Sequence, residues 1–435
     1  MRKRHAKRRA VSVASAVLAC SALVASADAG TSGASSVVHL TMWQQWGGGH
    51  EEQMLKAAIK QYEKLHPNIS ITETPVTNNA KILAAITGGN PPDIVDLGTS
   101  GALGGWASDG AIEPLNAMIK SSHLNLNQYV KAGLSAVTVK GQIYALPFMN
   151  FDVGLLYNKK LFAAAGLNPN KPPTTMAQLD ADAAKLTKVT KKGISQLGFV
   201  PNYPGPAQGQ ECPLMTYGWL YGGTWYSPSG KPTPATPADI KALSWEKSFY
   251  AKYGAQKVAN FVSSAGAYLT SGDPFESGKV AMVLDGPWAL QYIKANVPSM
   301  AKYIGVAPFP GSTTATRGTT FVDTNAQFIP RGSQHAKQAF AFIKWETTNA
   351  SLTAKFANDV ANLPQLKSVP HFGLESDPRF TLFEKEAAAK TAHTWTQSKT
   401  SSQYSTMLCQ AQDSALVGGS SPRAALTQLS SSIGA

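Results

Sequence analysis

The chain has 435 residues, of which 43% are hydrophobic, so it is too apolar for a disordered protein and long enough for two or three domains. Only 15% of the residues are charged, and the formal net charge is +13. A basic balance is typical of proteins that bind nucleic acid or anionic membranes, but six of the basic residues lie among the first nine. No dense basic stripe follows them, so we expect no nucleic-acid partner.

Residues 1–29 have the composition of an export signal. Six positive charges precede an uncharged stretch of Ala, Val and Leu, and small residues follow it. Two A-x-A cleavage sites compete, at residues 25–27 and 27–29, while Val17–Cys20 resembles a bacterial lipobox in which Cys20 would be lipidated. We therefore expect an exported protein, either anchored by lipid at the extracellular face of the cell membrane or free in the periplasm.

The other two cysteines, Cys212 and Cys409, can form a disulfide in an oxidising compartment if the fold brings them together. Two cysteines without a histidine at ligand spacing do not make a zinc site. We expect neither a metal nor a cofactor.

The first hundred residues alternate between strands and helices. A Gly/Ser-rich leader at 30–36 is followed by strands at 37–43, 69–74 and 93–97 and by helices at 50–65 and 81–87. Because the helices separate the strands, this order predicts an α/β unit with a largely parallel sheet.

The rest of the chain continues the α/β pattern around one region of loops. Residues 200–230 are rich in Pro, Gly and aromatic residues and are predicted to be mostly loop. Strands are predicted at 144–157, 280–284, 303–307 and 321–328, and helices at 159–165, 176–188, 237–252, 336–347, from 288, and over most of 377–426.

Catalytic signatures are absent from the sequence, since it has no phosphate-binding loop, no G-x-S-x-G and no H-E-x-x-H. Aromatic residues in loops are the distinctive feature instead. They include Trp43 and Trp46, a group between Tyr217 and Tyr226 that contains Trp219 and Tyr221, Trp288, Trp395 and Tyr404. A flat aromatic face can cover the C–H face of a sugar ring, although a single Trp is more often part of a core. We therefore predict a binding protein and not an enzyme.

The turn Trp46–Gly49 precedes a predicted helix and is a second candidate site. Exposed backbone amides at a helix N-terminus bind anions or hydroxyl groups, although an ordinary tight turn has the same sequence.

Four segments resemble the bacterial extracellular solute-binding proteins of ABC importers, in particular the carbohydrate-binding group that includes the maltose-binding protein. They are Ile86–Val95 with its P-D pair, Gly105–Leu115, the stretch Pro147–Phe162 with its Y-N pair, and Phe275–Ala289 with its G-P-W motif. Met149 and Ala164 depart from the family signature, and Leu97 stands where maltodextrin binders have Trp. The resemblance therefore favours the family more than it favours maltose.

The resemblance implies an α/β periplasmic-binding-protein fold with two lobes and a ligand cleft between them. The N-terminal lobe would comprise residues 37–147 and 306–350, and the C-terminal lobe residues 148–305 and 351–435, which would place both Cys212 and Cys409 in the same lobe.

The resemblance also implies that a sugar, expected to be an oligosaccharide, is captured and delivered to an ABC transporter permease by a monomeric protein. Its ligand-binding residues would be Gln44, Trp46, Asp96, Phe151, Trp219, Tyr221, Gly223, Trp288, Asp323, Trp395 and Tyr404, with Trp288 as the stacking residue. Two alternatives remain at this stage: the same fold binding a phosphorylated polyol or another non-sugar solute, and an exported carbohydrate-active enzyme.

Overall fold

Two β-sheets with helices around them organise the computed structural model, which describes residues 36–46, 49–203, 212–369 and 377–433. The predicted export signal, the lipobox with Cys20 and the middle of the Trp46–Gly49 turn lie outside the described residues. Val37–Ala435 forms one compact unit.

The first sheet combines three strands from the first hundred residues with four strands from later parts of the chain. Strand β1 pairs in parallel with β2 and β3, as the alternation of strands and helices predicts. Two later strands, β6 and β12, pair antiparallel to each other and extend this sheet, and β14 pairs with β12. The order is β13-β6-β12-β3-β1-β2. Its strands are β1 (Val38–Gln44), β2 (Ile69–Pro75), β3 (Ile94–Leu97), β6 (Ala145–Asp152), β12 (Thr320–Phe328), β13 (Leu363–Pro364) and β14 (Ala392–His393).

The second sheet has the order β11-β7-β10-β9-β8. Its central strand β10 runs parallel to β9 and antiparallel to β7. Its strands are β7 (Gly154–Asn158), β8 (Lys188–Thr190), β9 (Gly193–Phe199), β10 (Val280–Asp285) and β11 (Ile304–Ala307), and a separate hairpin joins β4 (Thr138–Val139) to β5 (Gln142–Ile143).

The helices divide between the two sheets by the core to which their buried residues belong. Around the first sheet lie α1 (His50–Leu65), α2 (Asn79–Thr87), α3 (Leu103–Ser108), α4 (Asn116–Ser121), α5 (Lys131–Ala136), α13 (Ala336–Thr348) and α14 (Ala350–Val360). Around the second lie α6 (Lys159–Ala164), α7 (Met176–Leu186), α8 (Pro213–Leu220), α9 (Pro237–Tyr253), α10 (Ala255–Ser263), α11 (Trp288–Asn296), α12 (Pro298–Ala301), α15 (Pro378–Ala387), α16 (Ser401–Leu416) and α17 (Pro422–Ser432). Short 3-10 turns lie at Leu126–Gln128 and Thr314–Thr316.

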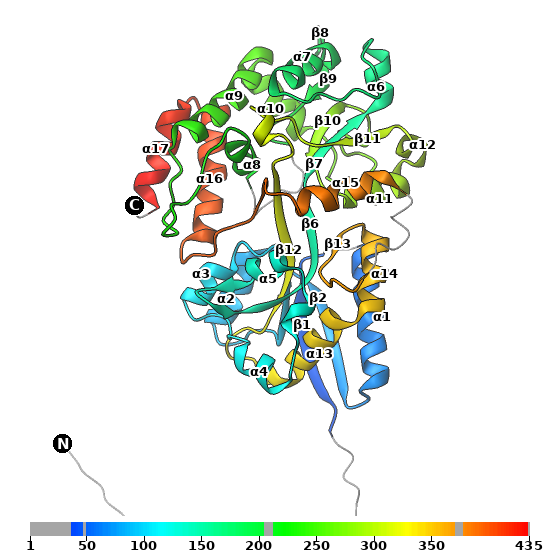
Figure 1. Cartoon of the computed structure of the whole chain (residues 1–435), viewed down its shortest axis with the longest axis vertical. Helices are drawn as coiled ribbons and strands as arrows, with labels where there is room; N and C mark the ends of the chain where they lie inside the picture. The colour runs from blue at the N-terminus through cyan, green and yellow to red at the C-terminus, as the bar shows by residue number, and fades with distance from the viewer. Residues whose placement is uncertain (1–35, 47–48, 204–211, 370–376, 434–435) are drawn as a thin grey trace, which may run out of the picture. The chain divides into compact units, whose positions relative to one another are not determined.

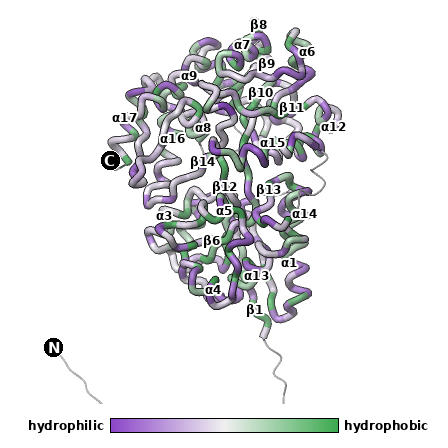
Figure 2. The backbone as a smooth tube through the Cα atoms, in the orientation of Figure 1, coloured by the Kyte–Doolittle hydropathy of each residue, from purple (hydrophilic) through white to green (hydrophobic). Residues whose placement is uncertain are grey.

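Two hydrophobic cores result, and strands β6 and β12 pass from one to the other (Figure 1). In β6, Phe148 and Met149 belong to the first core and Phe151 to the second. In β12, Phe321 belongs to the second core and Ala326 to the first. Figure 2 shows hydrophobic segments along these central strands and hydrophilic ones along outer helices such as α1. The paired strands β6 and β12 are therefore a direct covalent connection between the two cores.

The predicted lobe boundaries stay a prediction, but the packing differs from them in one segment. Leu352, Phe356, Val360, Leu366 and Val369 lie in the first core, although the predicted boundary assigns this stretch to the C-terminal lobe. The reason is that α14 packs against α1 and that β13 pairs with β6 of the first sheet.

Two predicted elements differ from the observed ones. The single strand expected over 144–157 is two strands, because the chain leaves the first sheet at Val153, whose N–H donates to Thr320 Oγ1, and enters the second. Helix α8 lies inside the region predicted as loop, and it begins with a proline at its first position, a residue that suits a helix start.

None of the helices among the described residues is both long enough and apolar enough to cross a membrane.

Candidate functional site

Five aromatic side chains lie one after another where β6 and β12 pass between the cores, and we call them the aromatic row. The Trp288 ring meets Phe151 edge-on at 5.5 Å between centroids, and Phe151 lies 6.2 Å from Phe321. Phe321 is followed by Trp219 at 6.2 Å, and Trp219 stacks on His393 at 4.7 Å with an interplanar angle of 12°. The row thus joins residues that are up to 242 positions apart in sequence.

Strand register explains why the row is continuous. Phe151 on β6 is paired with Asp323 on β12, two residues from Phe321, and Phe321 is in turn paired with His393 on β14. Trp219 comes from α8, and Trp288 is the first residue of α11, separated from the end of β10 by Gly286 and Pro287. The structure therefore brings together three of the predicted site residues, Phe151, Trp219 and Trp288.

The indole of Trp288 is held at its N–H edge. Its Nε1 donates a hydrogen bond to the hydroxyl of Tyr268 at 2.6 Å, and that hydroxyl donates to Asp285 Oδ1 at 2.8 Å. Burial raises the pKa of Asp285 to about 8, although the hydrogen bond from Tyr268 opposes this rise. The six-membered ring of Trp288 lies against Gly286, where a Cβ would come within 1.9 Å of it. Trp288 itself is partly exposed, so a part of it is available to a ligand.

A second partly exposed indole, that of Trp46, is held in the first core in a similar way. Its Nε1 donates to Asp96 Oδ2 at 2.8 Å, and its ring meets Phe148 of β6 edge-on at 6.2 Å. The backbone N–H of Trp46 donates to Gln44 Oε1 at 2.7 Å. Gln44 and Asp96 are fully buried, so in this conformation they support Trp46 from beneath.

A pair of buried carboxyl groups lies behind Trp46. The Gln327 amide donates to Asp96 Oδ2 at 3.1 Å and to Glu346 Oε2 at 2.7 Å. Burial raises the pKa of Asp96 to about 6, against the hydrogen bonds from Trp46 and Gln327. Burial and the nearby charge of Asp96 raise the pKa of Glu346 to about 8. Both groups belong to the interior of the first core, so they do not face each other across an open space.

Asp323 and Trp395 lie near the middle of the site. Asp323 accepts hydrogen bonds from the Ser100 hydroxyl at 2.5 Å and from the Ser100 N–H at 3.0 Å. Trp395 meets Phe321 edge-on at 6.5 Å, and its buried Nε1 has no hydrogen-bond partner among the described residues. The Gln397 amide donates to the Ser100 carbonyl at 3.1 Å, which ties the C-terminal segment to β3 and its following loop.

The remaining predicted residues lie elsewhere in the second core. Tyr221 packs beside Trp245 and has the Lys241 ammonium 5.5 Å above its ring. A Cβ at Gly223 would come within 2.0 Å of Asp239, so neighbouring atoms already occupy the space beside Gly223. Tyr404 is fully buried, and its hydroxyl donates to the Trp225 carbonyl at 3.2 Å. No ring contact among the described residues links Tyr221 or Tyr404 to the aromatic row, and their predicted role in binding stays a prediction.

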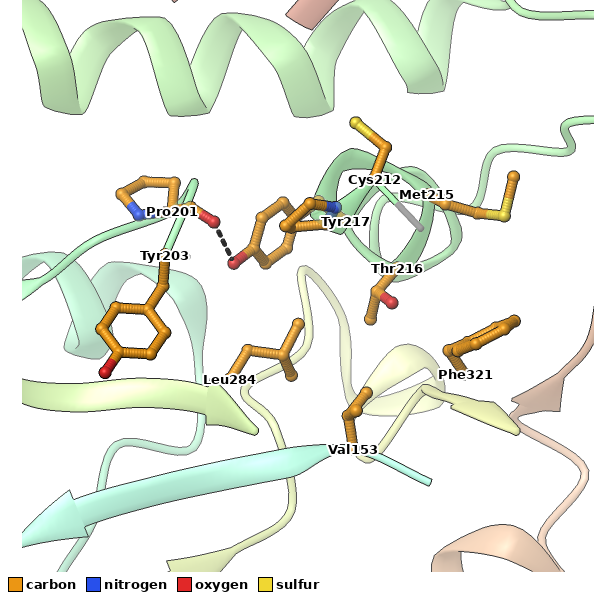
Figure 3. Close-up of a pocket in the computed structure, with 10 residues that line it drawn as sticks. Val153, Pro201, Tyr203, Cys212, Met215, Thr216, Tyr217, Leu284 and Phe321 are labelled. Atoms are coloured by element: carbon orange, nitrogen blue, oxygen red, sulfur yellow. Dashed lines mark hydrogen bonds between the residues drawn. The ribbon is translucent and has the colours of Figure 1, made fainter. Parts of the chain in front are cut away.

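A separate pocket in the second core shares only Phe321 with the row (Figure 3). Apolar side chains such as Val153, Met215 and Leu284 line most of it, and the Tyr217 hydroxyl on its wall donates to the Pro201 carbonyl at 2.9 Å. Its volume is about 40 Å³, far below the roughly 300–1,000 Å³ of ligand pockets. A sugar does not fit there. We take the aromatic row and Trp46 as the candidate site because Trp288 and Trp46 are partly exposed indoles.

Sequence reasoning missed four residues of this site. Asp285 lies within the D-G-P-W segment already quoted for the resemblance, and its buried strand end was an available signal. Phe321 and His393 become site residues only through strand pairing. Tyr268 lies in a segment of turns and gave no signal.

Both remaining cysteines, Cys212 and Cys409, are free thiols in the structure. Cys212 is buried and donates to Gln412 Oε1 at 2.7 Å. Burial and hydrogen bonding to the neighbouring Cys409 raise the pKa of Cys212. The two thiols are thus adjacent, and their pairing stays a prediction. Within the described ranges, no three His, Cys, Asp or Glu side chains gather as a metal ion would require.

Residues 47–352, well over half of the chain, match the family model described as bacterial extracellular solute-binding protein. A putative binding protein of Brucella abortus is 27% identical over 361 residues, which cover 79% of this chain and 78% of that protein. The mannitol-binding protein of Pseudomonas aeruginosa is 29% identical over 318 residues, which cover 70% and 68% respectively.

The solved structure of CpMnBP1 with mannotriose bound is similar to this chain throughout. The TM-score is 0.83 and the sequence identity is 32%, over 91% of this chain and 100% of CpMnBP1. This similarity confirms the predicted α/β fold with two lobes.

Proposed function

Because this chain belongs to the bacterial extracellular solute-binding protein family, we propose that it captures a neutral oligosaccharide between its two lobes and delivers it to an ABC transporter permease. The observation that carries the proposal is the aromatic row, with partly exposed Trp288 at one end and with Trp46 presented by the other lobe. Flat indole faces suit the C–H faces of sugar rings.

A mannose oligosaccharide is the first ligand to test. CpMnBP1, which is 32% identical to this chain, has mannotriose bound, and the Pseudomonas relative is a mannitol-binding protein. Both names describe neutral polyhydroxylated solutes, which fits a site with aromatic walls.

The proposal includes the arrangement of the whole protein. Residues 1–29 would direct export, with either cleavage or lipidation at Cys20, and the protein would act as a monomer without catalysis. The lobes would close on the ligand by bending at β6 and β12, because these paired strands connect the cores. Closure by a ligand requires that it bind the closed state better than the open one.

Thermal shift with the purified chain tests the ligand class. Mannotriose, maltotriose, mannitol and sn-glycerol 3-phosphate are compared, and a ligand at 100 times its Kd raises the free energy of unfolding by about 2.7 kcal/mol. We expect mannotriose to stabilise the chain and to be recovered intact. Stabilisation by sn-glycerol 3-phosphate alone would favour a phosphorylated-polyol binder, and cleavage of the trisaccharide would favour an enzyme.

The variant Trp288→Ala tests the site. Loss of a stacking face should weaken mannotriose binding by about 1–3 kcal/mol, measured by calorimetry. A matched control is Trp43→Ala, which removes a partly exposed indole near the end of β1. An unchanged affinity in Trp288→Ala would place the ligand elsewhere.

A further inference from the structure

The indole of Trp288 is fixed through a chain of hydrogen bonds that ends inside the second core. Trp288 Nε1 donates to the Tyr268 hydroxyl at 2.6 Å, and the Tyr268 hydroxyl donates to Asp285 Oδ1 at 2.8 Å. Asp285 is the last residue of β10 and is 2% exposed, and its Oδ1 also accepts the N–H of Gly286 at 2.7 Å. The carboxyl group is therefore held in place by the strand and by the backbone of Gly286. Tyr268, which is hydrogen-bonded to it, in turn holds the indole N–H.

The contacts of Trp288 limit its ring from several directions. The edge-on ring of Phe151 lies 5.5 Å away with an interplanar angle of 89°. The backbone at Gly286 lies so close that an added Cβ would overlap the six-membered ring. With its N–H edge held by Tyr268 as well, the indole has one position before any ligand arrives. Side chains that must be ordered on binding weaken affinity, so an indole ordered beforehand favours binding.

Trp46 in the other lobe is held by the same principle. Its Nε1 donates at 2.8 Å to Asp96, a fully buried carboxylate near the end of β3, and its ring meets Phe148 of β6 edge-on. The two lobes thus each present an indole whose N–H is linked by hydrogen bonds to a buried carboxyl group near the end of a strand. The difference is that Trp46 is held directly, whereas Trp288 requires Tyr268 in between.

We propose that Tyr268, oriented by Asp285, is a positioning residue that sets the angle of the Trp288 indole for stacking on the ligand. Tyr268 acts through Trp288 and not by touching the ligand. This inference rests on the proposed function, since the affected step is sugar binding. The part of the proposal that concerns the hydrogen bond between Tyr268 and the indole does not depend on the ligand being a mannose oligosaccharide.

The first measurement needs no ligand. In the indole N–H NMR spectrum of the ligand-free chain, the Trp288 signal is identified by its loss in Trp288→Ala. We expect Tyr268→Phe, which removes only the hydroxyl, to shift or broaden that signal more than any other indole signal. Tyr157→Phe is the control, because it removes a hydroxyl from the same core that is bonded to the Pro169 carbonyl. An unmoved Trp288 signal in Tyr268→Phe would overturn the proposal.

The second measurement is a double-mutant cycle with mannotriose as the probe. We expect Tyr268→Phe to weaken binding by about three- to tenfold in the wild-type chain and by less than twofold in Trp288→Ala, because its effect passes through the indole. Equal weakening in both backgrounds would mean a general structural role and would overturn the proposal. Absence of mannotriose binding in the wild-type chain would overturn the proposed ligand class. The NMR measurement would then test whether Tyr268 positions the Trp288 indole.

A second variant covers the case in which Tyr268→Phe does not fold. Asp285→Asn keeps the shape of the side chain and one oxygen that can accept from the Tyr268 hydroxyl, and it replaces the other carboxyl oxygen by an amide NH2 group. We expect Asp285→Asn to shift the Trp288 signal less than Tyr268→Phe does, and to weaken mannotriose binding less than Tyr268→Phe does. If Asp285→Asn changes neither, Asp285 does not orient this pair.

Discussion

The hydroxyl of Tyr292 donates a hydrogen bond to Oε2 of Glu51, which joins α11 of the second core to the first turn of α1 in the first core. Tyr292 lies one helical turn after Trp288, and its neighbour Gln291 donates to the Asn358 carbonyl of α14 at 2.9 Å. Two hydrogen bonds from α11 therefore connect the lobes beside the aromatic row.

Removing this connection should favour the open state. In Tyr292→Phe the hydrogen bond to Glu51 is lost, which costs about 1 kcal/mol in the state where the lobes are in contact. We expect mannotriose to bind about fivefold more weakly and small-angle scattering of the ligand-free chain to give a larger radius of gyration. Tyr303→Phe, which alters an exposed tyrosine of the same lobe, should change neither. Tighter binding by Tyr292→Phe would contradict a role in closure.

Gly286 should tolerate no side chain, because a Cβ there would lie 1.9 Å from Cζ3 of Trp288. Gly286→Ala forces the indole away from its bond with Tyr268, so we expect at least a tenfold loss of mannotriose affinity by calorimetry. The control is Gly278→Ala at the preceding turn, where nothing lies within 4 Å of an added Cβ, although its φ of 73° makes that variant somewhat less stable. Comparable affinities for the two variants would show that the ring moves aside without consequence.

The buried Glu346 should make stability depend on pH. Its pKa is raised from 4.5 to about 8 in the folded chain, so the folded state holds a proton that the unfolded state releases above pH 4.5. The stability it contributes is therefore complete below pH 4.5 and is lost as pH rises towards 8. We expect Glu346→Gln, which still accepts from Gln327, to gain in Tm relative to the wild type by about 2 °C or more between pH 5 and pH 8. A Tm difference that does not change with pH would mean that Glu346 is ionised throughout.

Regular elements with one apolar face were predictable from the sequence. Helix α1 occupies His50–Leu65 as expected, because Leu55, Ile59 and Tyr62 recur at helical spacing and all three are buried. Helix α8 was not predictable, because its buried residues lie on all sides and leave no periodic pattern. The passage of the chain from the first sheet to the second at Val153 was also not predictable. A buried strand that changes sheets has the same apolar sequence as one that continues in the same sheet.

The candidate site was predictable only where one local motif carries it. Trp288 follows from the G-P-W motif, and Phe151 from the segment before the Y-N pair. Phe321 and His393 depend on the pairing of β12 with β14, which joins residues 72 positions apart. The predicted ligand contact of Asp96 stays a prediction, and a sequence does not reveal that this carboxylate is buried and accepts the indole N–H of Trp46.

The neighbouring thiols of Cys212 and Cys409 allow a last prediction. Both are free in the structure, yet they lie close enough to interact, with Cys212 next to the start of α8 and Cys409 on α16. Mild oxidation with diamide should therefore join them, and a crosslink across so long a loop should stabilise the chain by about 2–4 kcal/mol. The experiment uses a chain with Cys20→Ser, so that only these two thiols remain, and Cys409→Ser is the control. We expect peptide mapping without reductant to find the linked pair and dithiothreitol to reverse the rise in Tm. Recovery of both cysteines as alkylated thiols after oxidation would show that α8 and α16 hold them apart.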